Sequence, residues 1–225
     1  MFVAALVIVL GVWGFAFLLG EVREGDTMNF DGRVLRAFRK TDDPSKLIGP
    51  KWVESVVRDL TALGGVVVLF LVVGTVAIFL MLIRRWHMMW LLLAATVGAT
   101  AINSTIKGLV ERPRPHVVSQ LTDVSSESFP SGHSAMSAAV YLTLGGLLAQ
   151  TVSRRRIKLY FIFVAMGLTI LVGVSRVCLG VHYPTDVLAG WTTGLVWALL
   201  CWLAARYLQR RGAIEKEVDP MVRKG

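Results

Sequence analysis

Six long apolar stretches alternate with polar connectors along the chain. They fall near residues 2–20, 60–83, 88–106, 134–152, 159–177 and 187–205. A helix needs about 20 apolar residues to cross the roughly 30 Å hydrocarbon core of a bilayer, and each stretch is close to that length. The pattern therefore predicts an all-α integral membrane protein, a bundle of six transmembrane helices.

The first stretch has some features of a cleaved signal peptide. However, no Lys or Arg precedes it, and it is longer than the apolar core of about 7–15 residues that such peptides carry. We expect it to remain in place as the first span. All six spans belong to one predicted domain, residues 1–211, and the polar residues 212–225 are predicted to be a disordered cytoplasmic tail.

The charge distribution predicts how the chain lies in the membrane. The net charge of +9 could indicate a nucleic-acid partner, but the connectors after the second and fourth spans, with the tail, carry twelve basic and three acidic residues. The opposite connectors carry twelve of each. Because short cytoplasmic loops are rich in Lys and Arg, both termini are predicted to be cytoplasmic, in a multi-pass protein of the plasma (inner) membrane. An anionic inner leaflet explains the charge without nucleic acid.

The first outer connector, about residues 21–59, contains an amphipathic helical pattern. Its apolar side comprises Phe30, Val34, Leu35 and Phe38, and its basic residues are Arg33, Arg36, Arg39 and Lys40. The pattern fits a helix lying on the membrane surface. It fits equally a loop helix packed on the protein, and both interpretations stay open.

Cationic side chains also gather at the outer ends of the spans, against the inside-positive trend. Lys and Arg often extend their charge to the interface from span ends, which would explain one or two of them. The group of outer residues is larger: Lys107, Arg112, Arg114, Arg176, His133, His182 and Asp186. It therefore calls for a reason of its own.

Ser131-Gly132-His133 comes directly before the fourth span. Ser131 can cap that helix, whose first N–H groups lack intrahelical partners and form a ready anion site. Gly132 would let an oxyanion approach the backbone closely. Taken alone, the segment also fits an ordinary turn with an N-cap.

His182 and Asp186 stand four residues apart at the start of the sixth span. This spacing can bring the carboxylate against one ring nitrogen, which fixes the tautomer and leaves a lone pair on the other. A nucleophilic histidine needs that arrangement. A capping or interfacial pair is the alternative. With the neighbouring cations as a phosphate cradle, one histidine could attack phosphorus while a second protonates the leaving oxygen.

The same residues match the three-part signature of the type 2 phosphatidic acid phosphatase (PAP2) superfamily. The parts are Lys107 with Arg114-Pro115 after six residues, Pro130-Ser131-Gly132-His133, and Ser175-Arg176 with His182 and Asp186. The match is in order and without departure. The chain thus resembles this superfamily over residues 107–186 and, through the six-span layout, over nearly its whole length.

The resemblance implies a helical bundle of the PAP2/haloperoxidase type that hydrolyses a lipid phosphate through a phosphohistidine, without a metal or other cofactor. It implies that His182 is the nucleophile, that Asp186 orients it, and that His133 is the general acid and then the base. The implied phosphate ligands are Lys107, Arg114, Ser131, Gly132 and Arg176.

Several substrates and functions are compatible with the sequence. The outward site makes undecaprenyl diphosphate the first candidate, with phosphatidylglycerophosphate, phosphatidic acid and lipid A phosphates open, as is transfer of the phosphate to a second lipid. Six spans argue against a soluble vanadate-binding haloperoxidase. A transporter usually carries ionisable residues near the middle of its spans, and none is found there. Oligomeric state is not predicted.

Four residues have weaker assignments. His116 either approaches the substrate headgroup or is a polar loop residue, and Arg112, outside the signature, is interpreted as an outer-leaflet contact. His87 is predicted to be interfacial. Cys178 is expected to serve packing.

Overall fold

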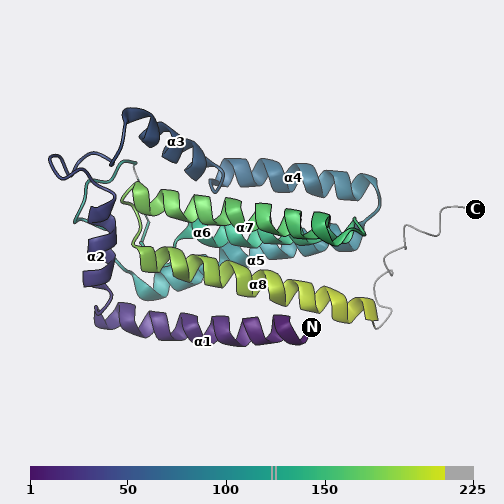
Figure 1. Cartoon of the computed structure of the whole chain (residues 1–225). Helices are drawn as coiled ribbons and strands as arrows, with labels where there is room; N and C mark the ends of the chain where they lie inside the picture. The colour runs from purple at the N-terminus through teal and green to yellow at the C-terminus, as the bar shows by residue number, and fades with distance from the viewer. Residues whose placement is uncertain (123, 125, 211–225) are drawn as a thin grey trace, which may run out of the picture.

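The described residues, 1–122, 124 and 126–210 of a computed structural model, form eight helices and no β-sheet (Figure 1). The helices are α1 (Phe2–Glu24), α2 (Met28–Ala37), α3 (Lys51–Ala62), α4 (Val66–Leu82), α5 (Trp86–Val110), α6 (Gly132–Gln150), α7 (Arg155–Cys178) and α8 (Pro184–Arg210). The all-α prediction is confirmed. The predicted tail, residues 212–225, lies outside the described part of the chain.

The span count differs from the predicted six. Four helices, α1, α5, α7 and α8, are each long and apolar enough to cross a membrane. The pair α3 and α4 passes the same test as a fifth, bent by 45° at the break between them. The stretch predicted at 60–83 is therefore not one straight helix, because the chain breaks at Leu63-Gly64-Gly65.

Helix α6 does not count as a span by length and hydropathy, although it has 19 residues. It lies among α5, α7 and α8, so much of its surface contacts protein (Figure 1). Ser134 and Ser137 on this helix are fully buried. A helix enclosed by other helices has less need of apolar side chains, and small residues let its neighbours approach closely.

Two glycines set the contact between α8 and α6. A Cβ atom on Gly190 would lie 2.5 Å from the carbonyl oxygen of Ser131, and one on Gly194 would lie 2.3 Å from that of Ala135. Neither contact is sterically possible, so only glycine permits this approach of the two backbones. The result is that the start of α6 lies directly against the first turns of α8.

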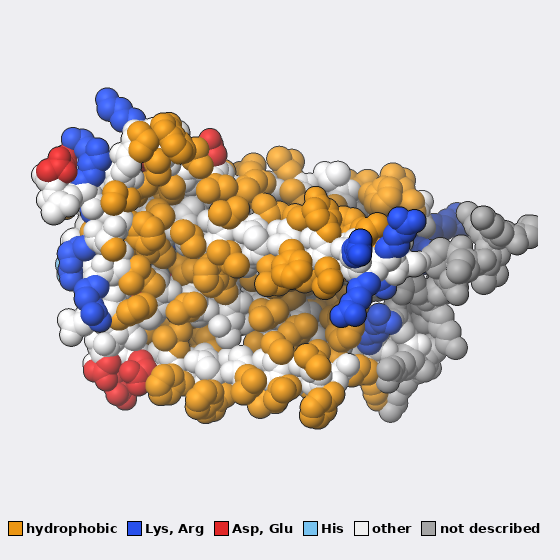
Figure 2. All heavy atoms as spheres, in the orientation of Figure 1, with side chains coloured by type: hydrophobic (Ala, Val, Ile, Leu, Met, Phe, Trp, Pro, Cys, Tyr) orange, Lys and Arg blue, Asp and Glu red, His pale blue; other side chains and the backbone are white. Residues whose placement is uncertain are grey.

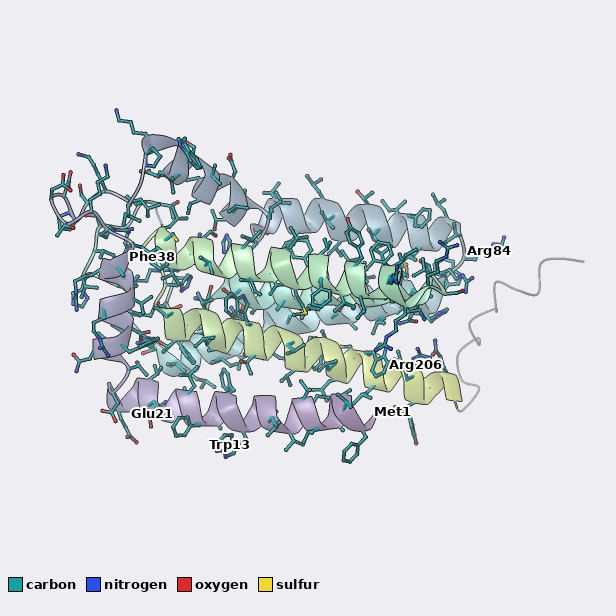
Figure 3. The ribbon with its side chains drawn as sticks, viewed as in Figure 1. Met1, Trp13, Glu21, Phe38, Arg84 and Arg206 are labelled. Atoms are coloured by element: carbon teal, nitrogen blue, oxygen red, sulfur yellow. The ribbon has the colours of Figure 1, made fainter. Side chains whose placement is uncertain are left out.

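The two ends of the bundle differ in charge. Met1, Arg84 and Arg206 lie at one end, and Glu21 and Phe38 lie at the other (Figure 3). A broad hydrophobic band separates these ends on the visible face, and the acidic side chains visible there lie at the end of Glu21 and Phe38 (Figure 2). The residues predicted to share one membrane face are therefore grouped together.

Helix α2 crosses the end of the bundle where α1 finishes (Figure 1). Leu35 is fully buried, and Val34 and Phe38 pack around the same cluster, which includes Tyr183. Phe30 remains 49% exposed. Of the two interpretations of this amphipathic segment, the structure favours a helix whose apolar side packs largely on protein.

Arg39 was expected on the basic side of that helix, but it is only 5% exposed. Its guanidinium donates to the carbonyl oxygens of Cys178 at 2.7 Å and Ser119 at 3.0 Å. These bonds tie the segment after α2 to the C-terminal end of α7 and to the loop that contains Ser119.

Candidate active site

His182 lies in the short loop between α7 and α8 and is 2% exposed. Burial lowers the pKa of its imidazole to about 4, with the positive charges of Arg176 and Arg114 acting in the same direction and Asp186 opposing them. The ring is therefore neutral at pH 7. A neutral imidazole keeps a lone pair for nucleophilic attack.

Asp186 stands in the first turn of α8 and is fully buried. Its Oδ2 atom lies 3.6 Å from Nδ1 of His182, beyond hydrogen-bond distance, and Nδ1 has no hydrogen-bond partner within the described chain. The same oxygen accepts a 2.8 Å bond from the N–H of Tyr183 and another from the hydroxyl of Ser128. The spacing of four thus brings the two side chains together, with 3.6 Å between Nδ1 of His182 and Oδ2 of Asp186.

Arg112 corrects one prediction. It is not an outer-leaflet contact, because it is 7% exposed and donates to Oδ1 of Asp186 at 2.5 Å and to Oδ2 of Asp31 at 2.8 Å. Its guanidinium also lies 4.1 Å from the centre of the Tyr183 ring. Ion pairs with two buried carboxylates hold this arginine inside the protein and away from the membrane interface.

Arg114 lies beside the other ring nitrogen of His182. Its Nη1 is 3.3 Å from Nε2 of His182 and donates to the carbonyl oxygen of Val181 at 2.7 Å. Its Nε donates to the carbonyl oxygen of Ser126 at 2.6 Å. Burial lowers the pKa of the Arg114 guanidinium, but an arginine stays protonated at pH 7. A fixed cation therefore lies where Nε2 would meet a phosphate.

Lys107 and Arg176 approach from two further helices. Lys107, in the last turn of α5, donates from Nζ to the carbonyl oxygen of Glu127. Arg176, near the end of α7, is 4% exposed and donates to the hydroxyl of Thr61 at 3.0 Å, while its Nε has no partner among the described residues. The positive charges of Arg176 and Lys107 both act electrostatically on the imidazole of His133.

The start of α6 brings His133 into this group. The hydroxyl of Ser131 caps the helix, accepting from the N–H of Ser134 at 3.4 Å, and the N–H of Ser131 donates to the carbonyl oxygen of Asp186 at 3.0 Å. The first backbone bond of the helix runs from the N–H of Ala135 to the carbonyl oxygen of Ser131, so the N–H groups of Gly132 and His133 have no backbone acceptor within the helix. A phosphate role for Ser131 stays a prediction, since its hydroxyl serves the cap.

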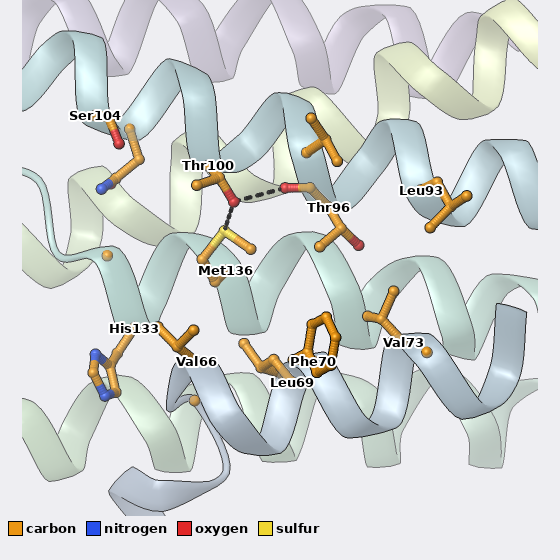
Figure 4. Close-up of a pocket in the computed structure, with 15 residues that line it drawn as sticks. Val66, Leu69, Phe70, Val73, Leu93, Thr96, Thr100, Ser104, His133 and Met136 are labelled. Atoms are coloured by element: carbon orange, nitrogen blue, oxygen red, sulfur yellow. Dashed lines mark hydrogen bonds between the residues drawn. The ribbon is translucent and has the colours of Figure 1, made fainter.

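A groove of about 500 Å³ begins at Gly132 and His133 and continues between α4 and α5 (Figure 4). Its apolar lining includes Val66, Leu69, Phe70, Val73, Leu93, Val97 and Met136. Asn103 is 6% exposed and lines the end near Gly132, where its Oδ1 has no described partner. The groove thus runs from Asn103 and from His133 at the start of α6 along an apolar wall.

The remaining candidates lie outside this constellation. His116 is exposed on the loop after Arg114. His87 is in the first turn of α5, at the opposite end of that helix from Lys107. Cys178 packs in an apolar cluster with Leu179, as expected for a packing residue.

Sequence reasoning missed Asp31, Ser128 and Asn103. Asp31 and Ser128 carry no local signal, because each reaches the site through tertiary packing of a loop or a short helix. Asn103 did carry one: it precedes Lys107 by four residues on α5, which places both side chains on one face of that helix.

Known proteins resemble this chain in sequence. A sequence model described as the PAP2 superfamily matches residues 88–210. Phosphatidylglycerophosphatase B from Bacillus subtilis (strain 168) is 35% identical over 156 residues, which cover 67% of this chain and 74% of that protein. A lipid A 1-phosphatase from Rhizobium johnstonii is 39% identical over 74 residues, which cover 33% of this chain and only 26% of that protein.

Solved structures give the same result. A transmembrane PAP2-type phosphatidylglycerolphosphate phosphatase from Bacillus subtilis superposes with a TM-score of 0.81 at 28% identity, covering 90% of this chain and 98% of that one. LpxE from Aquifex aeolicus, at 24% identity, shares the fold with a TM-score of 0.56 over 69% of this chain and 88% of its own. The chain therefore belongs to the PAP2 superfamily, as a membrane lipid phosphatase that hydrolyses phosphoric esters.

Proposed function

We propose that this phosphatase works through a phosphohistidine at His182. Nε2 of His182 attacks phosphorus, the bond from phosphorus to the lipid oxygen breaks, and His133 gives its proton to that oxygen. His133 then takes a proton from water, which attacks the phosphohistidine and releases inorganic phosphate. The observation that carries this proposal is a buried, neutral His182 with a carboxylate at one ring nitrogen and Arg114 at the other.

The cations supply the remaining chemistry. Lys107, Arg114 and Arg176, with the free N–H groups at the start of α6, would hold the three non-reacting phosphoryl oxygens. Charge-assisted bonds of this kind strengthen as negative charge develops in the transition state. Because the phosphate ligands are fixed cations, we propose that the reaction needs no metal.

The groove supports a lipid as the substrate. With the phosphate beside His182 and His133, a chain attached to the leaving oxygen would run along the apolar walls of α4 and α5 (Figure 4). Undecaprenyl diphosphate fits an outward-facing site, and the names of the relatives make phosphatidylglycerophosphate and lipid A phosphates equal priorities for testing.

A substrate panel with purified protein tests this proposal. Phosphate release from these lipids and from phosphatidic acid should persist in excess chelator. His182→Ala should abolish turnover and the acid-labile phosphoenzyme while leaving the protein folded. His116→Ala, which removes an exposed histidine nearby, is the matched control and should behave as the unsubstituted protein. Near-normal turnover by His182→Ala would refute the nucleophile assignment.

We further propose that the chain has six spans, namely the four long helices, the bent pair α3 and α4, and α6. We also propose that both termini are cytoplasmic and that the site faces outward. The grouping of Met1, Arg84 and Arg206 at one end of the bundle supports this topology (Figure 3). An impermeant thiol reagent applied to intact cells should label a cysteine at exposed Asp42 but not one at exposed Ser153, in a Cys201→Ser background. The reverse result would invert the orientation.

A further inference from the structure

Arg112 lies between two buried carboxylates that come from distant parts of the chain. Nη2 donates to Asp31 on α2 at 2.8 Å, and Nη1 donates to Asp186 on α8 at 2.5 Å. Both carboxylates are fully buried, and Arg112 is 7% exposed. We name this arrangement the Asp31–Arg112–Asp186 chain.

Asp31 also holds the first turn of α8 directly. Its Oδ1 accepts a 3.2 Å bond from the N–H of Thr185, and its Oδ2 accepts a 2.7 Å bond from the Thr185 hydroxyl. That hydroxyl lies 2.8 Å from Nη1 of Arg112, and the Tyr183 ring covers the guanidinium at 4.1 Å. The orientation of the guanidinium is therefore fixed on several sides.

The chain determines how Asp186 meets the nucleophile. Because Arg112 engages Oδ1 of Asp186, the second oxygen is left to face Nδ1 of His182 at 3.6 Å. Without Asp31, Nη2 of Arg112 would lose its charged acceptor and keep only the Thr27 hydroxyl at 3.2 Å and the Met28 sulfur at 3.7 Å, so the guanidinium could turn away from Asp186. A buried charge of this kind is costly to leave unpaired, so the three groups hold one another in place.

We infer that Asp31 and Arg112 are positioning residues that act on catalysis through Asp186, so that helix α2 forms part of the active site. This inference rests on the proposed role of Asp186 in orienting His182. It assigns a catalytic purpose to the first outer connector, which the superfamily signature does not include.

A purely structural tie between α2 and α8 is the competing explanation, and a double-mutant cycle on kcat separates the two. Asp31→Asn is introduced into the unsubstituted protein and into Asp186→Asn, and phosphate release from phosphatidic acid in detergent micelles is measured. If Asp31 acts through Asp186, kcat should fall about 10–100-fold in the first background and less than about threefold in the second. KM should change little in either.

Asp26→Asn, at an exposed acid just before α2, is the matched control and should leave kcat unchanged. Equal losses in the two backgrounds, or no loss in the first, would overturn the inference. Should Asp31→Asn fail to fold, Arg112→Lys, which keeps the charge but loses the fork, is judged by the same criteria. Failure of both to fold would make the tie structural and also overturn it. Turnover by His182→Ala would instead refute the proposed function.

Discussion

Asp186→Asn is the substitution whose consequences follow most directly from the geometry. The groups that hydrogen-bond this carboxylate are donors: Arg112 to Oδ1, and Ser128 and the N–H of Tyr183 to Oδ2. An asparagine has one oxygen and one NH₂ group, so its NH₂ must face a donor in either orientation. We expect a loss of about 2–4 kcal/mol in unfolding free energy, because a buried charge pair is broken while Asp31 still holds Arg112.

The loss in rate should exceed what this destabilisation explains. If the NH₂ group turns to His182, it donates to Nδ1, which moves the ring proton to Nε2 and removes the attacking lone pair. If the oxygen faces His182, the tautomer is correct but the imidazole is less well held. We expect kcat to fall by about 10²–10⁴ with some activity remaining.

The assay is initial-rate phosphate release by detergent-purified protein at a temperature below the unfolding midpoint of the variant, with the folded fraction measured by size exclusion. Asp59→Asn on α3, an exposed acid, serves as the control and should match the unsubstituted enzyme. A folded Asp186→Asn with kcat within about threefold of the unsubstituted enzyme would show that His182 needs no carboxylate partner.

Three other substitutions or conditions give independent results. Burial lowers the pKa of His182 from 6.5 to about 4, so between these pH values the unfolded chain binds a proton at this residue and the folded chain does not. The free energy of unfolding should therefore fall by up to about 3 kcal/mol as the pH drops from 6.5 to 4. His182→Gln should show a shallower fall in melting temperature, and an equal fall would contradict the cause. Gly190→Ala should cost about 1–3 kcal/mol and reduce turnover, because its Cβ would press on the start of α6, whereas Gly146→Ala has open space and should be neutral. Gly74→Phe should fill the groove and lower kcat/KM for long-chain more than for short-chain lipid phosphates, with Gly167→Phe as the control outside the groove, and equal losses on both substrates would argue against chain binding there.

Much of the fold could be predicted because the bilayer demands long apolar helices. Helices α1, α5, α7 and α8 each contain a predicted apolar stretch. The apolar stretch predicted near residues 60–83 contains α4, but the break before it was not predicted, because the bend at Gly64 and Gly65 depends on packing. Gly64 lies against α7, where a Cβ would come 2.4 Å from Val172.

The candidate site could be predicted only where its chemistry is local in sequence. His182 and Asp186 are only four residues apart, and the turn that leads into α8 brings the two side chains together as expected. Arg112 was misjudged, since both of its carboxylate partners lie more than 70 positions away. No periodicity or local motif reports that kind of pairing, which arises when α2 folds across the end of the bundle.

The position of His133 links the two halves of the proposed substrate site. It is the second residue of α6, so it lies at the end of the groove where that helix begins, whereas Met136, about one turn further on, lies on the groove's apolar wall. A phosphate at the cations would therefore leave its ester oxygen near His133 and its chain against α4 and α5. Charged and apolar recognition would then meet at the bond that breaks, and the proposed general acid, His133, would lie at that junction. On this proposal, a site built from buried and half-buried cations can serve a substrate that is mostly hydrocarbon, because only the headgroup has to leave the apolar phase.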